Sequence, residues 1–506
     1  MRLFFCFSNY HFNAKFAEKP PVTPTTLLIC FLAYTAILFI ITWFTARRAN
    51  SEGFYVGNRQ SPWFVVAYGM IGASMSGVTF MSVPGWVGTS QFSYFMVVLG
   101  YFFGYLVIAN ILLPLYYRLQ LTSIYTYLDQ RFGFWSYKTG AFYFLLSRVL
   151  GASLRMFLII YVLQHYIFDA WNFPFWLTVV IFIVLILLYT LKGGIKTIIW
   201  TDTLQTTFML LALVLSIVLI TKDLDFSFTE LASRIFKSDY SDMIVTDWSA
   251  RNHYLKQFLS GIFITIVMTG LDQEMMQKNL SCRNIGDAKK NMTTFSFIIV
   301  AANFIFLFLG AALYIYAGEK GIDLQTIGST DDIFPTIAIQ YLGPLAGLIF
   351  FVGLISAAFP SADGALTSLT TSFTIDFLGL QDKKHLSDKQ RTNIRYIVHT
   401  GFAVLMLGVI IAFRSFYDKA LIDKIFTIAG YTYGPLLGLY TFGLFTKHKV
   451  KDKWVPLVAI ISPIACYILA ENSYDWIGYK FGFELLILNG LITFVGLLLL
   501  RKRSGN

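Results

Sequence analysis

Runs of about 20 mostly apolar residues recur along almost the entire chain, and their length limits the possible folds more than any other feature. An α-helix of about 20 residues spans the roughly 30 Å hydrocarbon core of a lipid bilayer. Only 13% of the residues are charged, whereas about a quarter are charged in typical soluble domains. The sequence therefore predicts an all-α, polytopic membrane protein.

The apolar runs predict thirteen membrane spans. These spans are 25–46, 62–90, 94–117, 138–166, 172–191, 196–221, 254–277, 291–317, 334–374, 395–413, 420–445, 454–470 and 483–500. Together they make up one transmembrane domain, 25–500. It follows an N-terminal extension, 1–24, and precedes a short C-terminal tail, 501–506.

The distribution of basic residues predicts the orientation of the chain. The net charge is +11, and more than half of the 39 Lys and Arg residues fall in loops on one side of the predicted spans. One such loop begins with Lys278 and Arg283, whereas the opposite loop 222–253 mixes basic residues with many acids. Basic loops are typical of the cytoplasmic side, so we expect the N-terminus outside the cell and the tail in the cytoplasm. The charge therefore indicates a multi-pass protein of the cell membrane in contact with lipid, and no nucleic-acid partner.

Two of the predicted spans contain helix-breaking residues. One includes Gly72 and Gly77, and the other has Gly270 followed by Asp272. Interrupted helices in corresponding places of two halves are typical of transporters built from inverted repeats, with the binding site near the bilayer midplane. We therefore predict two repeats of five helices each. The predicted repeats are 62–221 and 254–445.

Asp363 lies at membrane depth in the stretch SAAFPSADGALTSLT. An ionisable group there costs at least about 2.5 kcal/mol unless it has a partner or a function. Pro360 leaves the carbonyl oxygen of Ser356 without its helical donor, and Ser361 adds another oxygen. The unwound backbone near 72–76 is expected to supply carbonyl oxygens from the facing side, and such a set of oxygens suits a hard monovalent cation. The alternative is a proline kink with a small-residue packing face, although packing does not need a carboxylate.

Three other ionisable residues fall inside the predicted spans. Asp202, in the sequence WTDTLQ, is a cation ligand, a member of a structural ion pair, or a residue at a solvated helix end. Arg148 and Arg155 share one helix face, and snorkelling or pairing with a carboxylate is favoured for Arg148. The guanidinium fork of Arg155 matches the carboxylate of a solute. The alternative for Arg155 is a buried pair with Asp202 or Asp363.

Several motifs resemble those of the sodium:solute symporter family. They are GASMSGVTFMSVPGW (72–86), GGIKTIIWTDTLQ (193–205), GLDQEMMQKNLSCRN (270–284) and GPLLGLYTFGLF (434–445). The resemblance covers about residues 25–500, and its motifs are specific in combination. It implies a LeuT-type core of five plus five helices with added helices, and import of a small organic solute with Na⁺ as the co-transported ion.

The resemblance also implies a sodium site between the first and eighth core helices. Carried onto this chain, its backbone carbonyls belong to Gly72, Met75 and Ala357, and its side-chain oxygens to the positions of Pro360 and Ser361. Pro360 departs from the pattern because it replaces a hydroxyl residue.

Asp363 is a second departure. It stands where some relatives have a serine that forms a second sodium site with the aspartate matching Asp202. Its carboxylate compensates for the hydroxyl that is lost at Pro360, binds a proton, or changes the sodium stoichiometry, and all three remain open. An uncoupled channel or a sensor on the same fold is a further alternative.

The same resemblance bears on the solute. Sugar carriers of the family use an asparagine and a tyrosine where this chain has Thr265 and Met268, so a neutral sugar is disfavoured. In sialic acid carriers, an arginine of the third core helix and hydroxyls of the first bind the substrate carboxylate. The matching residues here are Arg155, Ser74, Ser76 and Thr79. The expected solute is a sialic acid or a simpler carboxylate, and an amino acid, vitamin or sugar is the alternative.

A membrane-embedded enzyme is another class of function to weigh. Such enzymes usually need a histidine or a pair of carboxylates that face a cavity. The six histidines lie in or beside predicted loops, and the sequence contains no HExxH, GxSxG or Walker motif. We therefore expect a transporter and not an enzyme.

Overall fold

The computed structural model describes residues 22–46, 54–55, 57–383, 385–416 and 421–502. Most of the predicted N-terminal extension and the end of the predicted tail lie outside these ranges. The described residues form helices and short connecting segments, with two isolated β-bridges. The predicted all-α class is therefore confirmed.

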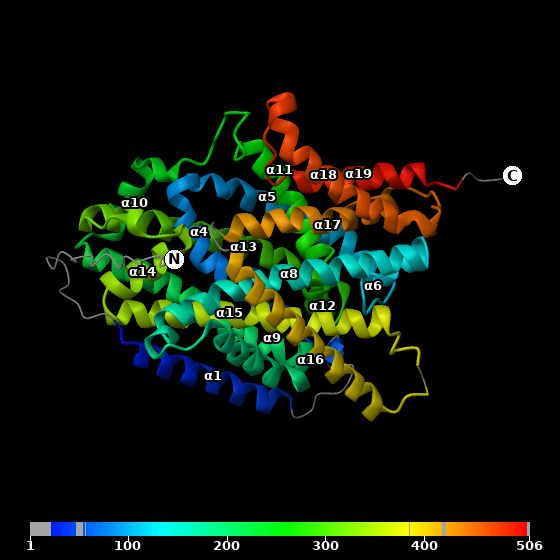
Figure 1. Ribbon diagram of the computed structural model, residues 1–506, viewed down its shortest axis with the longest axis horizontal. Coiled ribbons are helices and arrows are strands. Elements are labelled where there is room, and N and C mark those ends of the chain that lie inside the picture. The colour runs from blue at the N-terminus through cyan, green and yellow to red at the C-terminus, as the bar shows by residue number, and fades with distance from the viewer. Residues whose placement is uncertain (1–21, 47–53, 56, 384, 417–420, 503–506) are drawn as a thin grey trace, which may run out of the picture.

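Most of the helices run side by side along the long axis of the molecule, with α1 at one edge and α18 and α19 at the opposite edge (Figure 1). In chain order, the helices are α1 (Pro24–Ala46), α3 (Trp63–Ser74), α4 (Gly77–Ser90), α5 (Tyr94–Val107), α6 (Leu113–Arg118), α7 (Thr126–Arg131), α8 (Phe134–Tyr166), α9 (Phe175–Asp223), α10 (Phe228–Lys237), α11 (Tyr254–Thr265), α12 (Gln273–Leu280), α13 (Ile285–Lys320), α14 (Ile333–Thr336), α15 (Pro344–Ser372), α16 (Asp388–Phe413), α17 (Leu421–Phe445), α18 (Val455–Ile477) and α19 (Leu485–Leu499).

The helices carry the features of a polytopic membrane protein. In the part of the chain that the structure describes, eight helical segments are long and apolar enough to cross a membrane, or nine if α11 and α12 form one bent span. Large apolar side chains point outward on the peripheral helices, including Ile29 of α1, Ile397 of α16 and Leu499 of α19, which are 63%, 72% and 81% exposed. Lipid would cover such side chains. The exact number of thirteen spans is not confirmed.

Both predicted helix breaks are present. α3 ends at Ser74, and Met75, with φ −91° and ψ 86°, separates it from α4. α11 continues into a π-helix, Ile266–Gly270, and the chain then turns by 65° into α12. The carbonyl oxygens of Gly270 and Leu271 at this second break accept hydrogen bonds from the hydroxyls of Tyr116 and Tyr125. Each break thus interrupts the first helix of a predicted repeat, while the repeat boundaries stay a prediction.

One predicted span needs correction, and the division between two others is confirmed. The predicted span 334–374 is divided, because Gly343 has φ +93° and Pro344 starts a new helix, α15. The predicted division between the spans 172–191 and 196–221 is present, because α9 consists of two helices that meet at a kink, where Gly194 has φ 54° and ψ −158°. A Cβ at Gly194 would lie 2.5 Å from the Cα of Phe54, so a side chain does not fit there.

Several helices also begin earlier than their apolar runs. α16 starts at Asp388 and not at 395, because Ser387 and Gln390 form a capping box. α13 starts at Ile285, where the side chain of Asn284 accepts a hydrogen bond from the backbone N–H of Asp287 at 2.9 Å. Hydropathy finds the membrane segment of a helix, whereas the capping residues fix its first turn.

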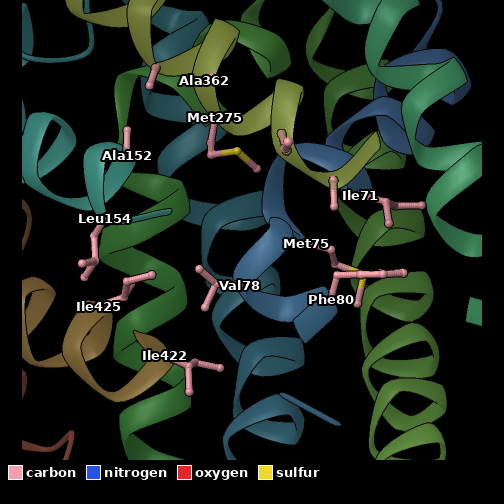
Figure 2. Packing of buried hydrophobic residues seen from close by; sticks show 14 of the residues in the cluster. Ile71, Met75, Val78, Phe80, Ala152, Leu154, Met275, Ala362, Ile422 and Ile425 are labelled. Atoms are coloured by element: carbon pink, nitrogen blue, oxygen red, sulfur yellow. The ribbon is translucent and has the colours of Figure 1, made fainter. Parts of the chain in front are cut away.

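The broken helix α3–α4 lies in the middle of the bundle. α3 packs against α9 and α15, α4 packs against α13, and α12 packs against both α3 and α15. Figure 2 shows apolar side chains of α4, α8 and α17 around this break, with Val78, Leu154 and Ile425 labelled. Apolar packing thus surrounds the irregular backbone and places it inside protein, where such backbone is tolerated at membrane depth.

Candidate solute and cation site

A cavity lies beside the break between α3 and α4, and side chains of α5, α8, α11, α13 and α17 complete its wall. The four residues predicted to bind the solute all line it: Ser74, Ser76, Thr79 and Arg155. Ser76 is buried, whereas the other three remain partly exposed. The structure therefore brings residues from the broken helix and from α8 together, as the sequence predicts.

Arg155 has no fixed partner in the described part of the chain, where it makes no ion pair and no hydrogen bond. The predicted alternative, a buried pair with Asp202 or Asp363, is wrong. The carboxylate of Asp202 pairs with Lys278, and that of Asp363 accepts a hydrogen bond from Tyr189. The guanidinium group of Arg155 is thus available to an anion in the cavity.

Three tyrosines of α5 line the same cavity, and the sequence analysis missed them. Tyr94, Tyr101 and Tyr105 fall on one face of the helix because they are seven and four residues apart. The hydroxyls of Tyr94 and Tyr101 lie 3.0 Å apart. The helical spacing of the tyrosines was the available signal. Thr265 and Met268, which the resemblance matched to residues of sugar carriers, also line the cavity.

The backbone of α3 meets α9 and α15 close to its break. The N–H of Gly72 donates to the hydroxyl of Thr206 at 2.9 Å. A Cβ at Gly72 would lie 3.5 Å from the carbonyl oxygen of Asp202 and 3.6 Å from the Cγ of Pro360. Residues that are far apart in the sequence, and that were predicted to hold the cation, therefore lie against one another here.

Several buried side-chain oxygens of α9 and α15 have no hydrogen-bond partner among the described residues. Asp363 is fully buried, and its Oδ2 accepts a hydrogen bond from the hydroxyl of Tyr189 at 2.7 Å. Its Oδ1, the Oγ of Ser361 and the Oδ1 of Asp202 are buried without a hydrogen-bond partner among the described residues. The side-chain amide of Gln205, one turn after Asp202, is likewise unpartnered. Buried polar atoms normally have partners, so these oxygens are available to a ligand.

Met75 and Ala357, the other two predicted cation ligands, are also buried, at 1% and 0% exposure. Met75 lies at the break itself, and its own N–H donates to the carbonyl oxygen of Ile71 at 2.7 Å. Ala357 lies in α15, one turn before Ser361. The assignment of their carbonyls as ligands stays a prediction.

Asp202 is not at a solvated helix end, because it is fully buried. Its Oδ2 lies 2.6 Å from the Nζ of Lys278, which is only 1% exposed. The sequence analysis placed Lys278 in a basic loop, and that placement is wrong. The 65° turn between α11 and α12 directs α12 back into the bundle, and this turn buries Lys278.

Arg148 does pair with carboxylates, as the sequence analysis favoured. Its Nη2 lies 3.1 Å from the Oδ1 of Asp272 and forms a second ion pair with Glu274. The hydroxyl of Tyr433 donates to the other oxygen of Asp272 at 2.7 Å. Arg148 also lines the cavity. It therefore joins the wall of the cavity to Asp272 and Glu274 at the start of α12.

Replacing Asp363 with Asn tests its part in cation binding. Asn removes the charge but keeps an oxygen that accepts from Tyr189. Removing one member of a buried charge pair costs about 2–5 kcal/mol. We therefore expect the sodium concentration that gives half-maximal thermal stabilisation of the protein to rise at least about tenfold. Asp376→Asn is the matched control, because Asp376 is also buried but accepts from Tyr137 and Ser372. Equal sodium dependence in both variants would reduce Asp363 to a packing role.

A model of the sodium:solute symporter family matches residues 54–452. The chain therefore belongs to the sodium:solute symporter family. It is 23% identical over 455 residues to the sodium/sialic acid symporter NanT of Aliivibrio fischeri, and the match covers 88% of each protein. It is 22% identical to the sodium/sialic acid symporter SiaT of Proteus mirabilis, over 90% of this chain and 92% of the relative.

The fold is also shared with a solved structure. A Na⁺-coupled sialic acid symporter in a substrate-bound, outward-open state has a TM-score of 0.80 and 20% identity to this chain, with coverage of 94% and 97%. This likeness confirms the LeuT-type fold. Family membership confirms that the protein is a sodium-coupled solute transporter of the multi-pass membrane type and belongs to no enzyme class.

Proposed function

We propose that the protein imports a small organic acid together with sodium, and that Arg155 binds the carboxylate of this acid. The observation that carries the proposal is the position of Arg155: its guanidinium group lines the cavity without an ion pair in the described part of the chain. A cation that is taken out of water needs an anionic partner. A solute carboxylate supplies it, and the fork of the guanidinium binds both carboxylate oxygens.

The rest of the cavity favours an acid with several polar groups. The hydroxyls of α3 and α4 lie on one side, and those of the α5 tyrosines complete the wall, with Asn303 and Thr269 nearby. Two similar symporters act on sialic acids, which carry one carboxylate and several hydroxyls. A sialic acid is therefore the first candidate, followed by a simpler carboxylate.

Sodium is proposed to bind where the broken helix meets α9 and α15. Its proposed ligands are the backbone carbonyls of Gly72, Met75 and Ala357 and the side chains of Ser361, Asp363 and Asp202. The unpartnered oxygens of the three side chains support this assignment. Sodium at the break stabilises one arrangement of α3 and α4, and the hydroxyls of that same segment line the solute cavity. Coupling requires such a shared two-state element.

The proposed orientation follows the positive-inside pattern, with the N-terminus outside the cell and the tail in the cytoplasm. The protein then lies in the cell membrane and uses the inward sodium gradient to drive uptake. We also propose that 62–221 and 254–445 are the two repeats that rock against each other around the site.

Thermal unfolding of the purified protein tests the proposal. Sugars, amino acids and organic acids, including N-acetylneuraminic acid, are compared in sodium chloride and in potassium chloride. A ligand at about 100 times its dissociation constant stabilises the folded state by about 2.7 kcal/mol. We expect stabilisation by an organic acid that is much larger in sodium than in potassium. Stabilisation by a neutral solute alone, or by an acid to the same extent in both salts, would contradict the proposal.

A further inference from the structure

Four buried side chains join the proposed cation site to the solute cavity in an unbroken row of alternating charge. Asp202 of α9 pairs with Lys278 of α12 at 2.6 Å. Lys278 lies 3.7 Å from Glu274, one turn back on the same helix. Glu274 in turn pairs with Arg148 of α8, which lines the cavity. Each member of this row, which we call the charge row, is at most 5% exposed.

We propose that Glu274 transmits sodium binding to the solute cavity through the charge row. This inference rests on the proposed function. The charges alternate from a sodium ion to Asp202, Lys278, Glu274 and Arg148, and then to the carboxylate of the solute. A positive ion at one end and a negative ion at the other therefore have the signs that continue the row. Charges interact over longer distances in the protein interior because water screens them less there.

The distances within the row are unequal, and the proposed response follows from this difference. Lys278 is close to Asp202 and farther from Glu274, so its contact with Glu274 is the one that shortens when the hold of Asp202 weakens. Sodium at the unpartnered Oδ1 of Asp202 draws charge from this carboxylate and weakens its hold on Lys278. Lys278 then approaches Glu274, and Glu274 loosens its pair with Arg148.

Two features of Arg148 allow its guanidinium group to act on the cavity when its pair with Glu274 loosens. Its Nε is buried and has no hydrogen-bond partner among the described residues. It also keeps Asp272 as a partner when Glu274 relaxes. The positive potential in the cavity then rises, and Arg155, seven residues along α8, attracts the carboxylate more strongly. Sodium thereby raises the affinity for the acid, and by thermodynamic reciprocity the acid raises the affinity for sodium by the same factor.

Gly364 of α15 lies directly against the carboxylate of Glu274. A Cβ at Gly364 would overlap the Oε1 and Cδ of Glu274, so a side chain at this point of α15 would displace the carboxylate from its present position. Gly364 directly follows Asp363, which we assign to the cation site. The bridging carboxylate therefore packs against the same helix turn that is proposed to hold sodium.

The test measures the coupling factor, which is the affinity for the acid in sodium divided by its affinity in potassium. The probes are N-acetylneuraminic acid and, as a smaller monocarboxylate, lactate, with binding followed by calorimetry on the full-length protein. Typical coupling factors are about 5 to 150. Glu274→Gln keeps the shape but removes the charge, and we expect the factor to fall about threefold or more towards one. Gly364→Ala, which displaces Glu274 without changing its charge, should have the same effect.

Two variants serve as controls. Asp376→Asn removes a buried carboxylate outside the charge row, and Gly408→Ala adds a methyl group where no atom lies within 4 Å. Both should keep the wild-type coupling factor. If Glu274→Gln and Gly364→Ala bind the acid more weakly by the same factor in both salts, Glu274 is structural and the inference is wrong. If Glu274→Gln does not fold, the coupling factor of Gly364→Ala alone tests the inference. If the wild-type protein binds both acids with the same affinity in sodium and in potassium, the proposed function is wrong, and the inference fails with it.

Discussion

Arg155→Ala is expected to abolish binding of the organic acid while sodium binding persists. Removing one member of a buried, hydrogen-bonded charge pair costs about 2–5 kcal/mol, which is roughly a 30-fold to several-thousand-fold loss of affinity. Arg155→Lys keeps the charge but loses the two-pronged geometry, so an intermediate loss is expected. The measurement is calorimetric titration of the purified variants with the acid, combined with sodium-dependent thermal stabilisation in the absence of acid.

A surface arginine provides the matched control. Arg234 forms ion pairs with Glu230 and Glu319 but is about 43% exposed, so Arg234→Ala should change acid affinity little. Unchanged acid binding in Arg155→Ala would show that Arg155 does not bind the carboxylate of the acid. Loss of both acid and sodium binding, together with a fall in thermal stability, would indicate instead that Arg155 supports the fold.

Local sequence signals were sufficient to place the centre of the molecule. Gly72 with Gly77, and Gly270 followed by Asp272, marked both broken helices, because interrupted helices in corresponding places of two halves are typical of transporters with inverted repeats. Asp363 and Arg155 stood out because an isolated charge at membrane depth needs a partner or a function. The structure confirms the breaks and gathers the predicted solute residues around one cavity.

The charge row, by contrast, was not predictable from local patterns. Lys278 and Asp202 are 76 residues apart, and a turn of 65° before α12 decides that they meet. A basic residue that follows an apolar run is normally assigned to a cytoplasmic loop. The sequence does not show that the chain turns back after the break between α11 and α12, so Lys278 was assigned in this way. The capping box that starts α16 was readable from the sequence, but hydropathy alone does not detect it.

Lys278→Met is expected to give the largest loss of stability among the variants proposed here. The change leaves Asp202 buried without its counter-charge, and breaking a buried ion pair costs about 3–5 kcal/mol. The double variant Asp202→Asn/Lys278→Met removes both charges and should recover most of this loss. Thermal unfolding of the detergent-solubilised proteins in potassium chloride measures both effects.

Two further measurements make this experiment specific: the response of Lys278→Met to sodium, and the stability of a variant in which a surface ion pair is broken. The buried carboxylate of Asp202 loses its partner in Lys278→Met and is available to a cation, so sodium should raise the unfolding temperature of this variant more than that of the wild type. Lys320→Met breaks the partly exposed pair with Asp223, and such pairs contribute only about 0–1 kcal/mol. If Lys278→Met is as stable as Lys320→Met, the buried pair is not a structural element. If sodium stabilises Lys278→Met no more than the wild type, Asp202 does not lie within reach of the transported ion, and the charge row loses its proposed link to sodium.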